Sequence, residues 1–141
     1  MMEQDLRLRK HADFQRVYKQ SRKHFSRQMG YFYALREENA APSAYSSTYA
    51  GPRIGLTVGK VMGKAVDRNR IKRRLRAAIV QHTHLLADHN VDVVLHPRRT
   101  ALTLEWTLLE RDVATAFSAI AKGLRTAQQA SAKNRAELPP A

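Results

Sequence analysis

The sequence predicts a mixed α/β fold, an α+β sandwich in which helices pack on a small, mixed four-stranded sheet. Two observations predict this class: three segments repeat their apolar residues at helical spacing, and short strand-like segments lie among them in the order α-β-β-β-α-β-α. The 141 residues suffice for one hydrophobic core, so we expect a single domain over residues 6–124. Residues 1–5 are expected to be flexible, and residues 125–141 to fray from helix into disorder.

The first predicted element is a helix over residues 11–21. Phe14, Val17 and Tyr18 share one face of this helix at helical spacing, and the basic residues lie off that face. The spacing by itself favours a core-packing role for these three side chains. Residues 29–37 contain three consecutive aromatic residues and predict a strand.

Two more strands are expected before the second helix. A short strand is placed around residues 45–50. Residues 53–60 alternate cleanly, with apolar side chains on one face and Gly55, Thr57 and Gly59 on the other. The small residues leave room for something to approach the sheet closely.

The second half is predicted to contain two helices and one strand. The helix over residues 67–87 begins with Asp67 as N-cap, and the strand over 91–95 is stopped by Pro97. A capping box at residues 107–110 opens the last helix. The core-facing stripe of the first of these helices is Ile71, Leu75, Ala78, Ile79, His82 and Leu86, and that of the second is Leu109, Val113, Phe117, Ile120 and Leu124.

The composition argues against several classes of function. The chain has no cysteine, which excludes disulfides and thiolate metal sites and fits a cytoplasmic location. No apolar run approaches the ~18 residues of a membrane span, and the N-terminus has no stretch typical of a signal peptide. The acids are scattered, and His82 and His84 point to different sides of a helix. We therefore predict no catalytic residue and no metal ligand on this chain.

Charge is the most informative total. The formal net charge is +13, and residues 1–76 hold 18 of the 25 Lys and Arg but only six of the 12 acids. A small domain with such an uneven positive field repels itself when alone and is stabilised beside a polyanion. Nucleic acid is the first partner that we expect, and an anionic membrane surface is the second.

The segment "DRNRIKRRLRAA", residues 67–78, concentrates this charge in a predicted helix. Solvated helices usually mix signs at i and i+4, which gains roughly 0.2–0.5 kcal/mol per pair, whereas Arg68 with Lys72 and Arg70 with Arg74 are like-charge pairs. Arginine forks and the free N–H groups at a helix N-terminus both suit phosphate oxygens. We therefore interpret the segment as a polyanion-binding helix rather than a solvated face.

Aromatic residues point to single-stranded nucleic acid. Eight of the ten aromatic residues lie in the first 50 residues. The same region has nine Arg and Lys residues from Arg7 to Arg36 and only one acid, Asp13, among them. Bases stack on rings while cations follow the sugar-phosphate backbone, so this combination is typical of single-strand binding. The alternative is that the rings of the first helix belong to the core.

Three ordered motifs resemble the protein component of bacterial ribonuclease P. The stretch "RIGLTVGKVMGKAVDRNRIKRRLRAAI" is similar to the family's strand, basic turn and Arg-Asn-Arg helix. Upstream, "LRKHADFQRVYKQSRK" resembles its first helix, and downstream "VDVVLHPRR" resembles its last strand followed by arginine. The similarity spans about residues 6–122.

The resemblance implies a left-handed β-α-β crossover and a role as the protein subunit of the ribonucleoprotein that cleaves the 5′ leader from precursor tRNA. The large catalytic RNA would carry the active site and its Mg²⁺ ions, and the protein would bind no cofactor of its own. The basic helix would bind that RNA in a 1:1 complex. A cleft between the first helix and the sheet would hold the single-stranded leader.

The site residues follow from the matched motifs and their neighbours. Those expected to bind the catalytic RNA are Lys64, Arg68, Asn69, Arg70, Lys72, Arg73, Arg74 and Arg76. Those expected in the leader-binding cleft are Phe14, Arg16, Tyr18, Lys19, Tyr33, Thr57, Lys60 and Arg98. Two departures bear on leader affinity: Val61 stands where the family commonly has a basic residue, and Pro97 is able to re-aim the arginine that follows it. A structural ribosomal-RNA-binding protein is the alternative function, and a basic DNA-binding protein is a third.

Overall fold

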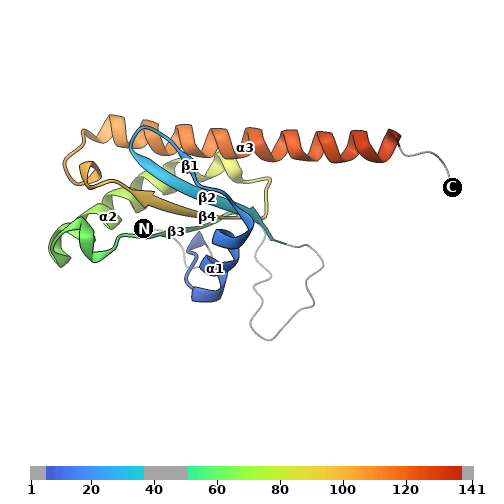
Figure 1. The fold of residues 1–141 in the computed structure, drawn as a ribbon. Helices are drawn as coiled ribbons and strands as arrows, with labels where there is room; N and C mark the ends of the chain where they lie inside the picture. The colour runs from blue at the N-terminus through green and yellow to red at the C-terminus, as the bar shows by residue number, and fades with distance from the viewer. Residues whose placement is uncertain (1–5, 37–50, 138–141) are drawn as a thin grey trace.

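Four strands form one sheet in the part of the chain that the computed structural model describes, residues 6–36 and 51–137 (Figure 1). The elements are α1 (His11–Gln20), β1 (His24–Phe25), β2 (Met29–Leu35), β3 (Arg53–Leu56), α2 (Ala65–His82), β4 (Val91–Pro97) and α3 (Trp106–Glu137). Short 3-10 segments lie at Lys60–Met62, Thr83–Leu86 and Arg99–Leu102. The predicted order of helices and strands is confirmed.

The sheet is mixed, with the strand order β1-β2-β4-β3. The pairs β1–β2 and β2–β4 are antiparallel, whereas β3 and β4 are parallel neighbours. A parallel pair needs a crossover connection, and α2 supplies it between β3 and β4. This arrangement confirms the predicted small mixed sheet with helices packed on it.

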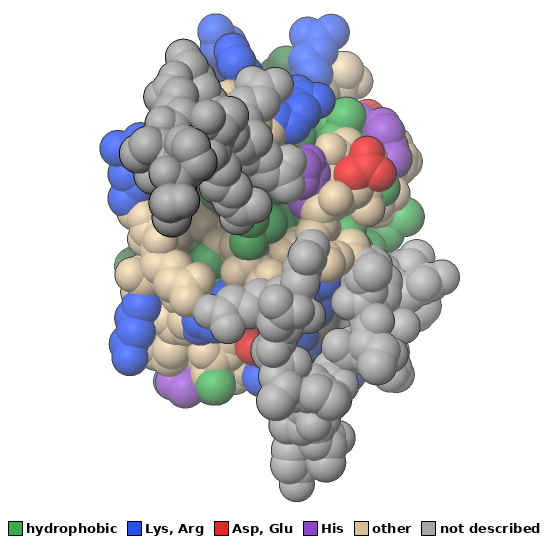
Figure 2. All heavy atoms as spheres, turned by 90° about the vertical axis from the view of Figure 1, so that its right-hand side faces the viewer, with side chains coloured by type: hydrophobic (Ala, Val, Ile, Leu, Met, Phe, Trp, Pro, Cys, Tyr) green, Lys and Arg blue, Asp and Glu red, His purple; other side chains and the backbone are tan. Residues whose placement is uncertain are grey.

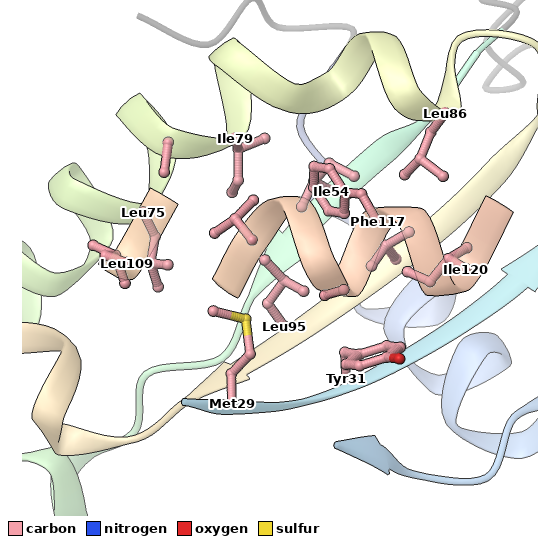
Figure 3. Close-up of a cluster of buried hydrophobic side chains, with 14 of the residues drawn as sticks. Met29, Tyr31, Ile54, Leu75, Ile79, Leu86, Leu95, Leu109, Phe117 and Ile120 are labelled. Atoms are coloured by element: carbon pink, nitrogen blue, oxygen red, sulfur yellow. The ribbon is translucent and has the colours of Figure 1, made fainter. Parts of the chain in front are cut away.

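Helices cover both faces of the sheet, with α2 and α3 on one face and α1 on the other (Figure 1). Alternation along β2 decides which side chains meet which helices: Met29, Tyr31 and Tyr33 face α2 and α3, whereas Phe32 and Ala34 face α1. The main core therefore lies between the sheet and the two long helices (Figure 3). Its largest fully buried side chains include Phe117, Met29, Ile54, Ile71, Leu75, Ile79, Leu86, Leu95, Leu109 and Ile120.

The helical stripes are confirmed with one exception. Every predicted core residue of α3 is buried, and so are those of α2 and the turn that follows it apart from His82. The His82 ring is half-buried, and its Nε2 lies 3.2 Å from Oε1 of Glu110 in α3. His82 therefore lies at the edge of the helix pair instead of within the core.

Both predicted N-caps are wrong, by three residues for α2 and by two residues for α3. Helix α2 begins at Ala65 after Lys64, whose side chain makes no capping hydrogen bond. Asp67 consequently lies inside the first turn, where its carboxylate is still favoured by the helix dipole. Helix α3 begins at Trp106, and the backbone N–H of Leu109 donates to the carbonyl of the residue before the helix, 3.0 Å away.

Several further boundaries differ from expectation. The strand predicted over residues 53–60 is β3, Arg53–Leu56, so Thr57 and Gly59 lie after it. The extra strand that completes the sheet is β1, and the predicted strand at residues 45–50 lies outside the described residues. Pro97 is the last residue of β4 and not the residue that stops it, because a missing N–H costs little at a strand end. Helix α3 continues past Leu124 to Glu137, and its C-terminal part extends beyond the sheet (Figure 1). No helix in the described part of the chain is long and apolar enough to span a membrane.

Candidate RNA-binding surfaces

The outer side of α2 carries a continuous set of cations because the inner side is fully occupied by the core. Ile71, Leu75 and Ala78 are completely buried, so the residues between them point outward. Asn69, Arg70 and Arg73 are exposed. We define the basic surface as these three residues with their exposed or half-buried neighbours on α2 and before it, Lys64, Arg68, Lys72 and Arg76.

Asp67 is the only acid of α2, and no ion pair joins the basic surface to an acid within the described parts of the chain. The ion pairs formed there involve the acids Asp13, Asp92 and Glu110, and none includes an arginine or lysine of α2. Burial, together with the nearby positive charge of Arg7, lowers the pKa of Arg76. Figure 2 shows Lys and Arg side chains at several separate places on another side of the molecule, with acidic side chains at few. The positive field on α2 is therefore left for an external anion.

Arg74 differs from its neighbours in α2. Its two terminal nitrogens donate hydrogen bonds to the carbonyl oxygens of Ala101 and Leu104, which tie the segment after β4 to the helix. Charge-assisted bonds of this kind are stronger than neutral ones, and they occupy the guanidinium. The sequence placed Arg74 among the RNA-binding residues, but the structure gives it a role inside the protein.

On the other side of the sheet, α1 packs closely because β3 presents a glycine to it. A Cβ built on Gly55 would lie 2.5 and 2.8 Å from two ring carbons of Phe14. The close approach of α1 thus explains Gly55, but not Gly59, of the small-residue face predicted for this strand. Phe14 and Tyr18 are half-buried beside fully buried Val17, so they belong partly to a second, smaller core.

Replacing Gly55 by alanine is expected to lower the free energy of unfolding by about 1–3 kcal/mol, because the added methyl group overpacks the contact with Phe14. Urea denaturation measures this change. Gly59→Ala is the matched control, since a methyl group added at Gly59 would meet no atom within 4 Å. Equal losses in both variants would contradict the close-approach explanation.

Beside the last turn of α1, aromatic side chains gather on the same face of the sheet. The Tyr18 ring meets Phe32 and His96 edge to face, at centroid distances of 4.9 and 5.6 Å. The Tyr18 hydroxyl lies 2.8 Å from Nε2 of His96 and 3.0 Å from Oγ1 of Thr57. Burial and then the charge of Lys23 lower the pKa of His96, so at pH 7 the neutral ring can accept a hydrogen bond from the Tyr18 hydroxyl.

The edge strand adds a free ring and a cation to this group. Phe25 is 65% exposed and pairs with Gly30, and the side chain of Lys23 crosses over the backbone of that glycine. The Lys23 ammonium lies 5.4 Å from the centre of the Phe25 ring. We define the aromatic surface as Tyr18, Lys23, Phe25, Phe32, Thr57 and His96.

The structure brings together only some of the residues predicted for the leader cleft. Tyr18 and Thr57 are in contact, whereas Tyr33 lies on the opposite face of the sheet, with its hydroxyl against Gly123 of α3. Its place in the cleft was therefore wrong, because alternation along β2 turns it away from α1. Lys19 is exposed on the side of α1 that does not pack on the sheet.

Three other predicted residues have different surroundings. Arg16 forms an ion pair with Asp92 instead of pointing into solvent. Lys60 begins the 3-10 segment before α2 and is exposed. Arg98 is exposed directly after β4, and its backbone N–H donates to the carbonyl of Gln28 at 3.1 Å. Neither of these two exposed cations forms an ion pair with an acid of the described residues.

Sequence reasoning missed four residues of the aromatic surface: Lys23, Phe25, Phe32 and His96. The alternation of side chains along a strand was the available signal for two of them. Phe32 lies between two residues of β2 that face α3, and His96 shares a face of β4 with Val94. Alternation alone could not show which face of the sheet α1 would cover. Within the residues described, no group of three or more His, Asp or Glu side chains is arranged to hold a metal ion.

Comparison with known proteins gives a consistent result. The model of the family described as ribonuclease P matches residues 2–121. A Staphylococcus aureus RNase P protein is 30% identical, with 83% of this chain and 95% of that chain covered and a TM-score of 0.62. A mutant of the S. aureus protein, described as defective in mRNA degradation, is also 30% identical, with coverage of 86% and 92% and a TM-score of 0.66.

A more distant structure shows the same fold. The RNase P protein from Thermotoga maritima is 18% identical, with coverage of 80% and 96% and a TM-score of 0.64. No match was found among curated proteins. The family model spans far more than half of the chain, including α1, the whole sheet and the basic surface. The chain therefore belongs to the ribonuclease P protein family.

Proposed function

We propose that this chain, as the protein subunit of the tRNA-processing ribonuclease P complex, binds RNA through two separate surfaces. The basic surface of α2 would bind the catalytic RNA. The aromatic surface beside α1 would bind the single-stranded 5′ leader of precursor tRNA. Family membership makes the chain the protein subunit of this ribonucleoprotein and gives it an RNA partner; the assignment of each surface is our inference.

One observation carries the assignment of the basic surface: its cations have no acidic partner among the described residues, although they repel one another along the helix. Arg68, Lys72 and Arg76 follow one another at i+4 spacing. Such a series lowers helix stability unless an anion lies beside it. A structured RNA presents phosphates in rows, and arginine forks bind them in pairs of hydrogen bonds.

The aromatic surface has the composition that a single strand needs. Phe25 offers an open ring face, and Lys23 next to it can follow the phosphates. Base stacking on such a ring is worth roughly 1–3 kcal/mol, and it tolerates any base. Sequence tolerance suits a leader, whose bases differ from one precursor to another.

We assign the hydrolytic chemistry and its Mg²⁺ ions to the RNA partner in a 1:1 complex. The family resemblance supports this part of the proposal. The protein would contribute affinity for the precursor tRNA and the position of its leader. It would hold the leader where RNA-bound metal ions can activate water and stabilise the leaving oxygen. Precursor tRNA would then bind more tightly than mature tRNA, because only the precursor has a leader.

Replacing Phe25 by alanine is expected to weaken precursor tRNA binding to the reconstituted complex by about 1–3 kcal/mol, with no change for mature tRNA. The ring is exposed, so the fold should be unaffected. Trp106→Ala is the matched control, since this ring is exposed at the start of α3 and outside both surfaces. Equal weakening for both tRNAs, or by the control, would contradict the proposed leader surface.

A further inference from the structure

A buried carboxylate lies on the α1 face of the sheet, near the start of β4. Asp92 of β4 is 0% exposed and is surrounded by three guanidinium groups from three segments. Arg53 of β3 donates to both of its oxygens, at 2.8 and 2.7 Å, and Arg36 after β2 donates to one at 2.7 Å. Arg16 of α1 donates to the second oxygen.

Arg16 is the member of this cluster that connects the helix to the sheet. Besides the Asp92 carboxylate, it reaches the carbonyl oxygen of Leu35 at 3.3 Å. A second, longer link joins Asp13 of α1 to Arg53 at 3.6 Å. The hydrogen bond with Asp92 raises the pKa of Arg53, which keeps this guanidinium charged. Asp92 keeps Arg36 and Arg53 even without Arg16, so the distinct effect of the Arg16 pair is to tie α1 to a buried group of the sheet.

The position of α1 matters for the aromatic surface because Arg16 lies in the chain between Phe14 and Tyr18. Phe14 contacts Gly55, and Tyr18 reaches Thr57 and His96. We infer that Asp92 is a positioning residue for the leader: through Arg16 it fixes the height and rotation of α1, so that the Tyr18 ring completes the aromatic surface. This inference rests on the proposed function.

A direct role for Arg16 in phosphate binding makes the opposite prediction. If Arg16 were a leader ligand that Asp92 merely holds back, Asp92→Asn would release a cation next to the aromatic surface and tighten precursor binding. In the positioning role the same substitution loosens α1 and weakens precursor binding. The amide has nearly the volume of the carboxylate, so the sign of the change separates the two roles.

The test uses the protein reconstituted with its RNA partner and compares Asp92→Asn, Arg16→Gln and the double variant. We expect each single variant to weaken precursor tRNA binding about tenfold. This is the loss of affinity expected when one base no longer stacks fully on an aromatic ring. The double variant should bind no more weakly than Asp92→Asn alone, because Asp92→Asn already removes the link to Arg16. Mature tRNA and RNA-partner affinities should stay unchanged. Tighter precursor binding by Asp92→Asn, or additive losses, would overturn the inference.

Arg16→Gln keeps the inference testable if Asp92→Asn fails to fold, because Asp92 then retains Arg36 and Arg53. Its salt dependence is decisive: positioning leaves the slope of log K against log salt unchanged, whereas removing a cation that binds a phosphate lowers it by about 0.7. A lower slope would assign Arg16 to the leader itself. If Phe25→Ala weakens precursor binding but these variants do not, the positioning role fails and the proposed leader surface stands.

Discussion

Replacing Arg70, Lys72 and Arg73 together by glutamine is expected to weaken binding of the RNA partner by about 100-fold or more. Bonds to charged groups contribute roughly 1.5–3 kcal/mol each, and even strong non-additivity leaves about 3 kcal/mol for three of them. The slope of log K against log salt should fall by about 0.7–0.9 for each phosphate that the variant no longer neutralises. Binding titrations at several salt concentrations measure both quantities.

The same triple variant should be more stable than the natural protein when RNA is absent. In the natural protein, like charges repel each other at i+4 spacing in three pairs: Arg70 with Arg74, Lys72 with Arg68, and Lys72 with Arg76. Removing each repulsive pair should raise the stability of the helix by roughly 0.2–0.5 kcal/mol. The control replaces three exposed cations of α3, Arg111, Lys122 and Arg125, by glutamine. The net charge of the two variants is then equal. If the control lost as much affinity, total charge rather than the basic surface would explain binding.

Phe117→Ala is expected to lower the free energy of unfolding by about 3–5 kcal/mol. Phe117 is the largest fully buried side chain and lies in the core between α3, α2 and the sheet (Figure 3). The expected loss combines the lost transfer free energy with a cavity that the packed core cannot close. Urea denaturation gives the value. Ser118→Ala, an exposed change in the next residue of the same helix, should alter stability by well under 1 kcal/mol. A loss below about 1 kcal/mol for Phe117→Ala would contradict the observed core.

Helical stripes were predictable because helix spacing is a local property. The buried residues of α2 and α3 could be read from positions three and four apart, and the outward direction of Arg70 and Arg73 followed from them. The start of α2 was not predictable to the residue. Asp67 has the chemistry of an N-cap, but the helix begins two residues before it, and its carboxylate is favoured inside the first turn as well.

Long-range contacts account for most of what the sequence could not show. Arg74 resembles its neighbours in the sequence, but its carbonyl partners are 27 and 30 residues away. Tyr33 and Phe32 are adjacent aromatic residues in one strand, and only the placement of α1 decides which of them faces it. Asp92 sits in an apolar strand with no sequence signal for the three arginines that surround it. These residues depend on topology, which periodicity does not contain.

The proposed function requires that two surfaces of this protein contact two different RNA segments. The absence of cysteine allows a single photo-crosslinker to be attached at Asn69→Cys on the basic surface or at Lys23→Cys on the aromatic surface. In the complex with the RNA partner and precursor tRNA, we predict that the probe at residue 69 crosslinks to the RNA partner and the probe at residue 23 to the leader. Crosslinks from both positions to the same RNA segment, or a residue 23 probe that reacts equally with mature tRNA, would contradict the claim.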